Sequence, residues 1–261
     1  MVTEEKIFVA RWGRQAQPLI IAHRGASADA VENTLPAFRL AREQGADGVE
    51  LDVLRCGSGE VVVFHDDDLA RLAHRPEAIR RLPYAALREI DLGAGARIPL
   101  LAQVFEELGP LLVNIELKTR PDWLGRARDD GLAHEVAALI RRHAVESRAL
   151  VSSFDPLLLA RFRRAAPAVP TGLLFGADQS RPFRHAWAAP LVQPTALHPE
   201  AALVDAPALR EWRRRGYCIH TWTVDDPAEL RALAALGVDG LITNRPAQAR
   251  RALCYHPHDG G

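Results

Sequence analysis

The chain has 261 residues, of which 48% are hydrophobic and 25% are charged, and this length suits one large domain or two small ones. Lysine and arginine together number 33, and so do aspartate and glutamate, which gives a formal net charge of +0. This balance excludes a basic surface of the kind that attracts nucleic acid or an anionic membrane, so any contact with phosphate must come from a local site.

Short apolar runs alternate with amphipathic stretches along most of the chain. The runs predicted as strands are Leu19–Ala22, Gly48–Val53, Leu111–Leu117, Ala149–Ser152, Thr171–Leu174, Leu191–Pro194, Tyr217–Trp222 and Val238–Ile242. The stretches predicted as helices are Thr34–Gln44, Leu101–Leu108, Gly131–His143, Pro156–Ala165, Ala208–Arg215, Pro227–Leu236 and Pro246–Leu253. Strands that alternate with helices indicate an α/β protein with a parallel sheet. Eight strands in this length favour a closed TIM (β/α)₈ barrel over an open doubly wound sheet.

One segment interrupts this alternation after the second strand. A turn at Gly57-Ser58-Gly59 is followed by Glu60–Phe64, which we interpret as a strand that returns in a hairpin. The chain then stays polar and partly helical up to Pro99, with its clearest helical piece at Tyr84–Ile90. We therefore predict a single domain over residues 1–261 that carries a small insertion at about residues 66–98.

The cysteines and the apolar runs bear on the compartment. Cys56, Cys218 and Cys254 are widely spaced and form no C-x-x-C pair, which excludes a disulfide scaffold and a thiolate zinc site. No apolar run approaches the ~20 residues of a spanning helix, and the first 17 residues do not resemble a signal peptide. We expect a soluble cytoplasmic protein with no transmembrane segment and no nucleic-acid partner; the sequence predicts no oligomeric state.

Acidic side chains alternate with apolar ones in two of the predicted strands. Glu50 and Asp52 share one face of the second strand, and Glu116 shares a face of the third with Asn114 and Lys118. Each charge buried without a partner costs several kcal/mol, and a single lysine cannot neutralise three carboxylates. A lone acid of this kind usually caps a helix or pairs with an arginine. Three together favour one hard divalent cation with oxygen ligands, Mg²⁺ or Ca²⁺.

Basic side chains stand where strands end. His23 ends the first strand and His65 the hairpin strand, and barrel active sites lie at the carboxyl ends of strands. A lone histidine there is usually structural, but two beside a predicted metal site favour proton transfer. Arg24 offers a planar fork for phosphate oxygens, with a surface ion pair as the alternative. Gly25 permits the close turn that aims these side chains.

A set of short motifs, in fixed order, covers the chain from about Ile20 to Pro246. The motifs are His23-Arg24-Gly25, Glu32-Asn33-Thr34, Glu50-Leu51-Asp52-Val53, His65-Asp66, Ile98-Pro99, Ile115-Glu116-Leu117-Lys118, Ser153-Phe154-Asp155, His198-Pro199, Trp222-Thr223-Val224 and the run from Gly237 to Pro246. In order and spacing they resemble the glycerophosphodiester phosphodiesterase family. The resemblance implies a TIM barrel with a small insertion after the second strand. It also implies hydrolysis of glycerophosphodiesters to glycerol 3-phosphate and an alcohol, with Mg²⁺ or Ca²⁺.

The resemblance assigns roles to individual positions. The residues that match the family's metal ligands are Glu50, Asp52 and Glu116; those that match its acid–base histidines are His23 and His65; those that match its substrate-binding positions are Arg24, Lys118 and Trp222. For Trp222 the alternative is core packing. Glu32 matches a family position near the site, where a structural role is the alternative.

The chain departs from the family pattern within and beside the insertion. The segment Asp67–Ala73 lacks the usual threonines, and Leu100 stands where a threonine is usual. Because of these changes, the sequence does not indicate which alcohol group the substrate carries. Two further hypotheses remain: a lysophospholipase-D-like enzyme, for which the polar insertion offers no apolar groove, and a non-catalytic barrel that binds phosphate ligands, which would typically have lost a metal ligand or a histidine.

Overall fold

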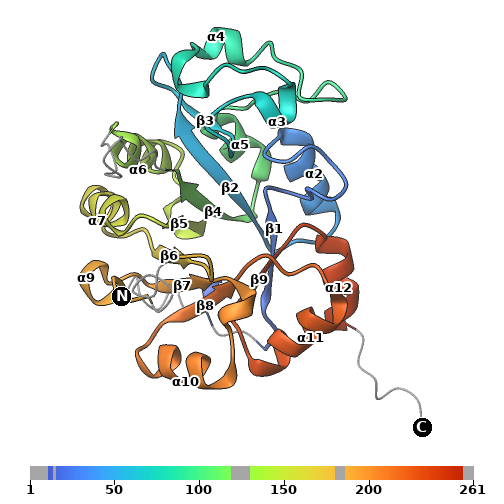
Figure 1. Ribbon diagram of the computed structural model, residues 1–261, viewed down its shortest axis with the longest axis vertical. Helices are drawn as coiled ribbons and strands as arrows, with labels where there is room; N and C mark the ends of the chain where they lie inside the picture. Colours follow the sequence, from blue (N-terminus) through green and yellow to red (C-terminus); the bar gives the residue numbers. More distant parts are fainter. Residues whose placement is uncertain (1–10, 14–15, 119–129, 180–185, 255–261) are drawn as a thin grey trace.

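The computed structural model describes residues 11–13, 16–118, 130–179 and 186–254. Within them, eight parallel strands form a closed barrel: β1 pairs with both β2 and β9, and the order around the barrel is β1-β9-β8-β7-β6-β5-β4-β2 (Figure 1). The barrel strands are β1 (Leu19–His23), β2 (Gly48–Arg55), β4 (Leu112–Leu117), β5 (Ala149–Ser153), β6 (Thr171–Phe175), β7 (Ala196–Pro199), β8 (Cys218–Thr221) and β9 (Gly240–Thr243). The predicted TIM barrel is confirmed.

Helices cover the outside of the barrel. They are α2 (Leu35–Glu43), α5 (Leu101–Leu108), α6 (Leu132–Arg142), α7 (Pro156–Ala165), α9 (Ala189–Val192), α10 (Ala206–Arg214), α11 (Pro227–Leu236) and α12 (Pro246–Cys254), with single 3₁₀ turns at η2 (Glu146–Arg148) and η3 (Ala201–Leu203). Several begin at a side-chain cap: Thr34 accepts a hydrogen bond from the backbone of Ala37, and Asp155 and Asp226 cap α7 and α11 in the same way.

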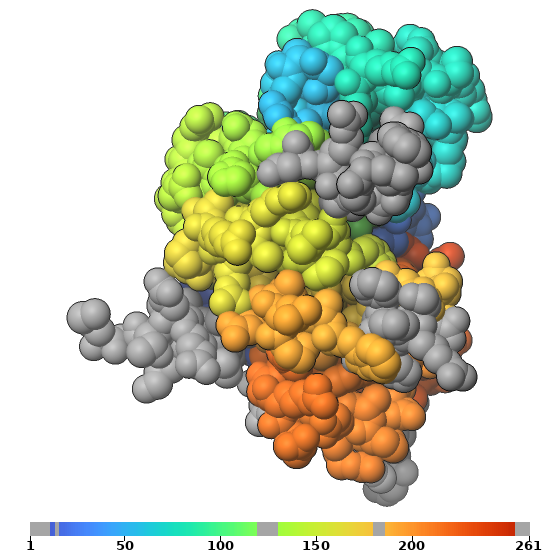
Figure 2. Space-filling model, turned by 60° about the vertical axis from the view of Figure 1, so that its left-hand side comes forward, coloured from blue at the N-terminus to red at the C-terminus, as the bar shows by residue number. Residues whose placement is uncertain are grey.

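The predicted return strand is present as β3 (Val61–Val63), which pairs with β2 in antiparallel orientation. Between β3 and α5 the chain forms α3 (Ala70–Ala73), η1 (Ile79–Arg81) and α4 (Tyr84–Leu87). This segment protrudes at one end of the molecule (Figures 1 and 2). It packs on a small hydrophobic cluster of its own, which includes Phe64 and Leu87. The cluster explains how a mostly polar insertion keeps a defined shape. That the whole chain is one domain stays a proposal.

One strand prediction is wrong. The run Leu191–Pro194 was expected to be a strand, but its first residues belong to the short helix α9, and the strand β7 begins at Ala196. Leu191 is 86% exposed, so this apolar run does not fill the core. Pro190 lies in the first turn of the helix, where its missing N–H costs no hydrogen bond, and Pro194, which also has no N–H to donate, lies outside the strand.

Apolar side chains fill the space between the barrel and its helices and also one end of the barrel interior. The other end of the interior is left for polar groups. Along β2, Val49, Leu51 and Val53 pack outward in the core beneath the helices, so Glu50 and Asp52 face the interior. The opposite end of the interior is filled by an apolar cluster of Trp12, Leu19, Ile21, Leu112, Leu150, Ala196, Cys218 and Ile242. None of the helices in the described part of the chain is long and apolar enough to cross a membrane.

Candidate active site

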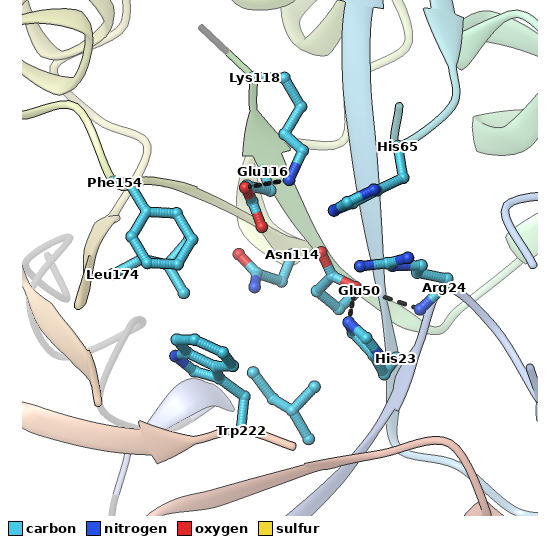
Figure 3. A pocket seen from close by; sticks show the side chains of 11 residues that line it. His23, Arg24, Glu50, His65, Asn114, Glu116, Lys118, Phe154, Leu174 and Trp222 are labelled. Atoms are coloured by element: carbon cyan, nitrogen blue, oxygen red, sulfur yellow. Dashed lines mark hydrogen bonds and ion pairs between the residues drawn. The ribbon is translucent and has the colours of Figure 1, made fainter. Parts of the chain in front are cut away.

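The residues predicted from the sequence come together at the carboxyl ends of the barrel strands. A cavity of about 180 Å³ is lined there by His23, Arg24, Glu50, His65, Asn114, Glu116, Lys118, Phe154, Leu174, Trp222 and Ile242 (Figure 3). Asp52, the remaining predicted residue, lies beside the cavity in ion pairs with Arg24 and Lys118. The structure therefore places all eight predicted side chains in or against one site.

The three carboxylates meet because β2 and β4 are neighbours in register. Asp52 pairs with Glu116 along the two strands, and Glu50 pairs with Asn114, so all face the barrel interior. One oxygen from each of Glu50, Asp52 and Glu116 lies within 4.8 Å of the others, and all three residues are buried. The prediction that they meet is confirmed; their role as metal ligands stays a prediction.

Two cations pair with this cluster. The Arg24 Nε lies 3.1 Å from Asp52 Oδ2, and its backbone N–H donates to Glu50 Oε2 at 3.1 Å. Lys118 Nζ lies 2.8 Å from Glu116 Oε1 and 3.2 Å from Asp52 Oδ1. Both cations also line the cavity. Each can therefore balance a carboxylate and still face a ligand.

The turn after β1 depends on Gly25. Arg24 and Gly25 both have positive φ, 57° and 84°. A Cβ at Gly25 would lie 2.7 Å from the backbone carbon of Ala37 in helix α2. A larger residue would push the turn away from the helix, so Gly25 permits the close turn as predicted.

The raised pKa values of two of the carboxylates indicate that the two cations do not fully offset burial and mutual repulsion. Burial raises the pKa of Glu50 well above its ordinary value, and Asp52 and Glu116 add to the effect. The pKa of Glu116 is also raised, mainly by burial. Burial acts in the same direction on Asp52, but Lys118 and Arg24 outweigh it and lower that pKa to about 2. Three converging carboxylates in this state fit a hard divalent cation, whose charge would favour their ionised forms.

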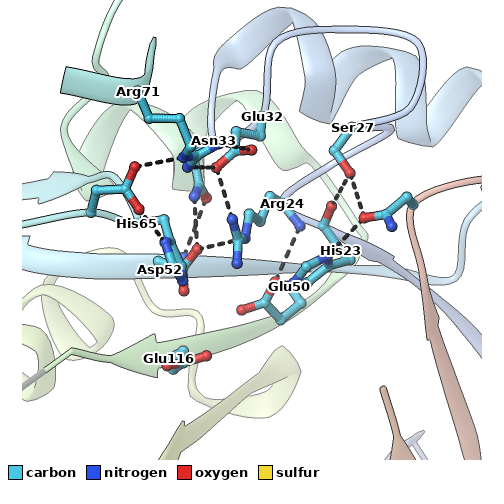
Figure 4. Close-up of polar contacts among 12 residues, drawn as sticks. His23, Arg24, Ser27, Glu32, Asn33, Glu50, Asp52, His65, Arg71 and Glu116 are labelled. Carbon is cyan, nitrogen blue, oxygen red and sulfur yellow. Dashed lines mark hydrogen bonds and ion pairs between the residues drawn. The ribbon is translucent and has the colours of Figure 1, made fainter. Parts of the chain in front are cut away.

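The side chain of His23 is held from behind by a chain of hydrogen bonds. Its Nδ1 lies 2.7 Å from Oδ1 of Asn244, which follows β9, and its Nε2 lies 3.9 Å from Glu50 Oε2 (Figure 4). The Asn244 amide nitrogen donates to Asp225 Oδ2 at 2.6 Å, and the Ser27 hydroxyl donates to Asn244 Oδ1 at 2.8 Å. An amide whose nitrogen faces Asp225 must turn its oxygen toward His23. Nδ1 therefore carries the hydrogen, and Nε2 faces the carboxylates.

The side chain of His65 is held by the insertion. Its Nδ1 lies 2.6 Å from Asp66 Oδ1, and Asp66 Oδ2 accepts from Arg71 Nε at 2.7 Å. Arg71 also donates to Glu32, which in turn pairs with Arg24 (Figure 4). Burial lowers the pKa of both His65 and His23. Both imidazoles can therefore be neutral near neutral pH, as groups that exchange protons require.

The opposite wall of the cavity is apolar and comes from β5, β6, β8 and β9. Trp222, directly after β8, donates its indole N–H to the carbonyl oxygen of His198 at 2.7 Å and meets the edge of Phe154, with ring centroids 5.6 Å apart. Ile242 and Leu174, of which Figure 3 labels Leu174, complete this wall. Trp222 thus has a packing partner and also faces the cavity.

Sequence reasoning missed several lining or supporting residues. Phe154 and Trp222 both stand in quoted motifs, but only Trp222 was assigned a place in the site. Asn114 was placed on the correct strand face without a role. Asn244 stands in the quoted run from Gly237 to Pro246 but was assigned no role, since its contact with His23 joins residues 221 positions apart.

The sequence matches the glycerophosphoryl diester phosphodiesterase family over residues 23–248. A glycerophosphodiester phosphodiesterase from Caldanaerobacter subterraneus is 32% identical over 237 residues, which cover 87% of this chain and 94% of that protein. The solved structure of a phosphodiesterase from Oleispira antarctica, in complex with the product sn-glycerol-3-phosphate, is 27% identical with a TM-score of 0.79 and covers 92% of this chain and 98% of that one. A glycerophosphodiester phosphodiesterase from Thermotoga maritima is 30% identical with a TM-score of 0.73, covering 91% and 99%. The chain therefore belongs to the glycerophosphoryl diester phosphodiesterase family and is a phosphoric diester hydrolase.

Proposed function

We propose that this protein hydrolyses glycerophosphodiesters to glycerol 3-phosphate and an alcohol, using one divalent cation, Mg²⁺ or Ca²⁺. The observation that carries the proposal is the convergence of Glu50, Asp52 and Glu116 within 4.8 Å, next to a cavity that two histidines line. The product named in the Oleispira antarctica structure supports the choice of substrate. The cytoplasmic location expected from the sequence stays a prediction.

Each group has a task in this reaction. The carboxylates of Glu50, Asp52 and Glu116 would hold the cation, which supplies Lewis-acid polarisation of a phosphoryl oxygen. Arg24 and Lys118 face the cavity and would offset the charge that the phosphoryl group carries during transfer.

The two histidines would move the protons. One accepts a proton from the attacking oxygen, and the other donates a proton to the oxygen of the leaving alcohol. The attacking oxygen belongs to water or to the 2-hydroxyl of the substrate's own glycerol. In either case the P–O bond to the alcohol breaks, and the alcohol leaves with the donated proton. Attack by water gives glycerol 3-phosphate directly. Attack by the 2-hydroxyl gives a cyclic phosphate, which water must then open to give glycerol 3-phosphate.

The lining of the site favours deacylated substrates. A neighbouring cavity of about 340 Å³ shares His65, Glu116, Lys118 and Phe154 with the first one, and Asp66 and Asp67 also line it. An acyl chain that extended in this direction would meet charged side chains instead of an apolar groove. A lysophospholipase-D-like activity is therefore the less favoured alternative.

A substrate panel tests the proposal. Glycerophosphocholine and glycerophosphoethanolamine are incubated with the protein beside lysophosphatidylcholine, with Mg²⁺ or Ca²⁺ present, and both glycerol 3-phosphate and choline are measured. Release of glycerol 3-phosphate from the deacylated diesters supports the proposal. Choline release from the lysolipid alone would replace it with the lysophospholipase reading, and no release from any substrate would favour a non-catalytic binding protein.

A further inference from the structure

Asn114 is a buried polar residue that the proposed reaction does not use. It lies in β4, and its residue is 1% exposed. Neither its amide nitrogen nor its amide oxygen has a hydrogen-bond partner among the described residues. A buried polar group without a partner costs about 1–3 kcal/mol, and native proteins rarely keep one without a reason.

The Asn114 side chain points into the cavity, at the boundary between its two walls. Its register partner on β2 is Glu50, which belongs to the charged wall. Across the cavity lie Phe154 and Trp222 of the apolar wall (Figure 3). The amide is therefore placed to meet a ligand that reaches from the charged wall toward the apolar one.

We propose that Asn114 recognises the hydroxyl groups of the substrate's glycerol unit and so makes the enzyme selective for deacylated glycerol; this inference rests on the proposed function. An amide offers both a donor and an acceptor, which matches a hydroxyl group that needs one of each. The apolar wall carries no charged side chain, which suits carbon atoms and disfavours the phosphate. The phosphate instead belongs with Arg24 and Lys118.

This placement explains how the site distinguishes a free hydroxyl from an acylated one. A hydroxyl bearing an acyl group has no proton to donate to the Asn114 oxygen, so that oxygen would stay buried and unpaired. Sites with buried polar groups reject ligands that lack the matching group far more strongly than apolar pockets reject a size change. One unpaired group corresponds to about a 10- to 100-fold loss of affinity.

Binding of two phosphate monoesters measures the role of Asn114 apart from catalysis. Glycerol 3-phosphate and propyl phosphate share the phosphate and the three-carbon chain, but only the first carries hydroxyl groups. Calorimetric titration in the presence of Ca²⁺ should give the wild-type protein a preference for glycerol 3-phosphate of about 10- to 100-fold. Asn114→Leu, which nearly keeps the volume, should reduce this preference below about 3-fold and leave the affinity for propyl phosphate almost unchanged.

Ser152 provides a matched control. Its register partner is Glu116, so it faces the same interior, and its buried hydroxyl also lacks a partner among the described residues; it does not line the cavity. Ser152→Ala should keep the full preference for glycerol 3-phosphate. Asn114→Leu should also raise the melting temperature of the ligand-free protein, because an amide that serves the ligand has no partner to lose in the fold.

Several results would overturn the inference. They are a wild-type protein with no preference for glycerol 3-phosphate, and an Asn114→Leu variant that keeps that preference. Ca²⁺ affinity lowered more than 10-fold in the variant would instead make Asn114 a cation ligand.

A second pair of variants serves if the leucine variant does not fold. Asn114→Thr and Asn114→Val, in which a hydroxyl replaces a methyl group, should differ in their preference for glycerol 3-phosphate over propyl phosphate. Equal preferences would contradict the proposal. A wild-type protein that binds glycerol 3-phosphate selectively but hydrolyses no glycerophosphodiester would refute the proposed function alone.

Discussion

At the scale of single residues, the two histidines of the cavity differ in what holds them. His23 contacts the neutral amide of Asn244, whereas His65 contacts the carboxylate of Asp66. Both nevertheless lie beside the carboxylate cluster and line the cavity. The site therefore contains two imidazoles that are held in place by different surroundings.

Removal of either imidazole tests this assignment. His23→Ala and His65→Ala should each lower kcat by about 10²- to 10⁴-fold, the usual contribution of positioned proton transfer. Ca²⁺ affinity, measured by calorimetry, should change little, because the carboxylates are untouched. Near-normal kcat in either variant would mean that the histidine in question is structural. The wild-type pH–rate profile should be bell-shaped. Its two apparent pKa values would describe the coupled pair of histidines and not one named residue each.

Mutation can separate the two roles proposed for Lys118, charge balance and phosphate binding. Its ammonium group pairs with Glu116 and Asp52, and these carboxylates raise its pKa although burial opposes them. Lys118→Met should tighten Ca²⁺ binding, because a cation beside a cation site is removed. If Lys118 also contacts the phosphate, kcat/KM should fall sharply, and Lys118→Arg should restore little of it, because a planar fork does not replace a compact ammonium group.

Calorimetry and steady-state kinetics on the same two variants decide between the functions. Tighter Ca²⁺ binding together with a normal kcat/KM in Lys118→Met would show that Lys118 only balances charge.

At the scale of elements, the end of β9 supports the end of β1. Asn244 follows β9 and holds His23 at the end of β1, and Asp225 in turn holds both the backbone and the side chain of Asn244. The orientation of His23 thus depends on the closure of the barrel between its first and last strands.

Loss of this support should affect turnover more than binding. Asn244→Leu removes the hydrogen-bond acceptor of His23 and should lower kcat by about 10- to 100-fold, because small misplacements of a reacting group are costly, with KM nearly constant. Asn244→Asp alone would place a carboxylate against Asp225, so the control is Asn244→Asp combined with Asp225→Asn, which exchanges donor and acceptor between the two side chains, keeps an acceptor for His23 and should retain more activity. Equal kcat values for wild type and Asn244→Leu would show that His23 needs no such support.

The elements also show which parts of the site a sequence can predict. Glu50, Asp52 and Glu116 interrupt apolar strands that are neighbours in the barrel, so alternation alone places them on one face. The apolar wall takes one residue from each of several strands, and a single apolar residue at a strand end looks the same whether it lines a cavity or packs in the core. Asn244 meets His23 only when the barrel closes, which no local pattern encodes.

The wrong prediction of a strand at Leu191–Pro194 has a related cause. An apolar run with prolines on both sides resembles a buried strand in composition. Whether Leu191 is covered depends on what packs over it, and in the fold it is exposed. The alternation of strands and helices was still sufficient to predict the barrel, since closure requires the number of strands and not their exact bounds.

At the scale of the whole molecule, the barrel interior contains a pair of histidines next to the apolar cluster that fills one of its ends. His220 contacts His198 through their ring nitrogens at 3.2 Å and also contacts the carbonyl oxygen of Trp12. Both histidines are fully buried. Burial lowers the pKa of His198 well below its ordinary value, with His220 adding to the effect, and burial also lowers the pKa of His220.

These shifts predict that the protein loses stability in mild acid. Below about pH 6.5 the unfolded histidines bind protons that the folded ones do not, so the free energy of unfolding falls by up to ~1.4 kcal/mol per pH unit for each extra proton bound. The free energy of unfolding is therefore highest above this pH and declines as the pH drops toward the pKa values of the folded histidines. Urea unfolding of wild type and His198→Gln between pH 7.5 and 5 isolates the effect, since His23 and His65 contribute equally to both. A pH dependence as steep in the variant as in the wild type would contradict the claim that buried His198 contributes to the loss of stability.

The central claim is that a divalent cation held by Glu50, Asp52 and Glu116 enables the hydrolysis of glycerophosphodiesters. The most direct test measures glycerol 3-phosphate release by protein that EDTA has stripped of metal, with the absence of metal verified by elemental analysis. The metal-free protein should be inactive, and addition of Mg²⁺ or Ca²⁺ should restore activity to wild type but not to Glu116→Gln. The cation should also raise the melting temperature of the wild type, because it binds the folded state. An undiminished rate in verified metal-free protein would contradict the account.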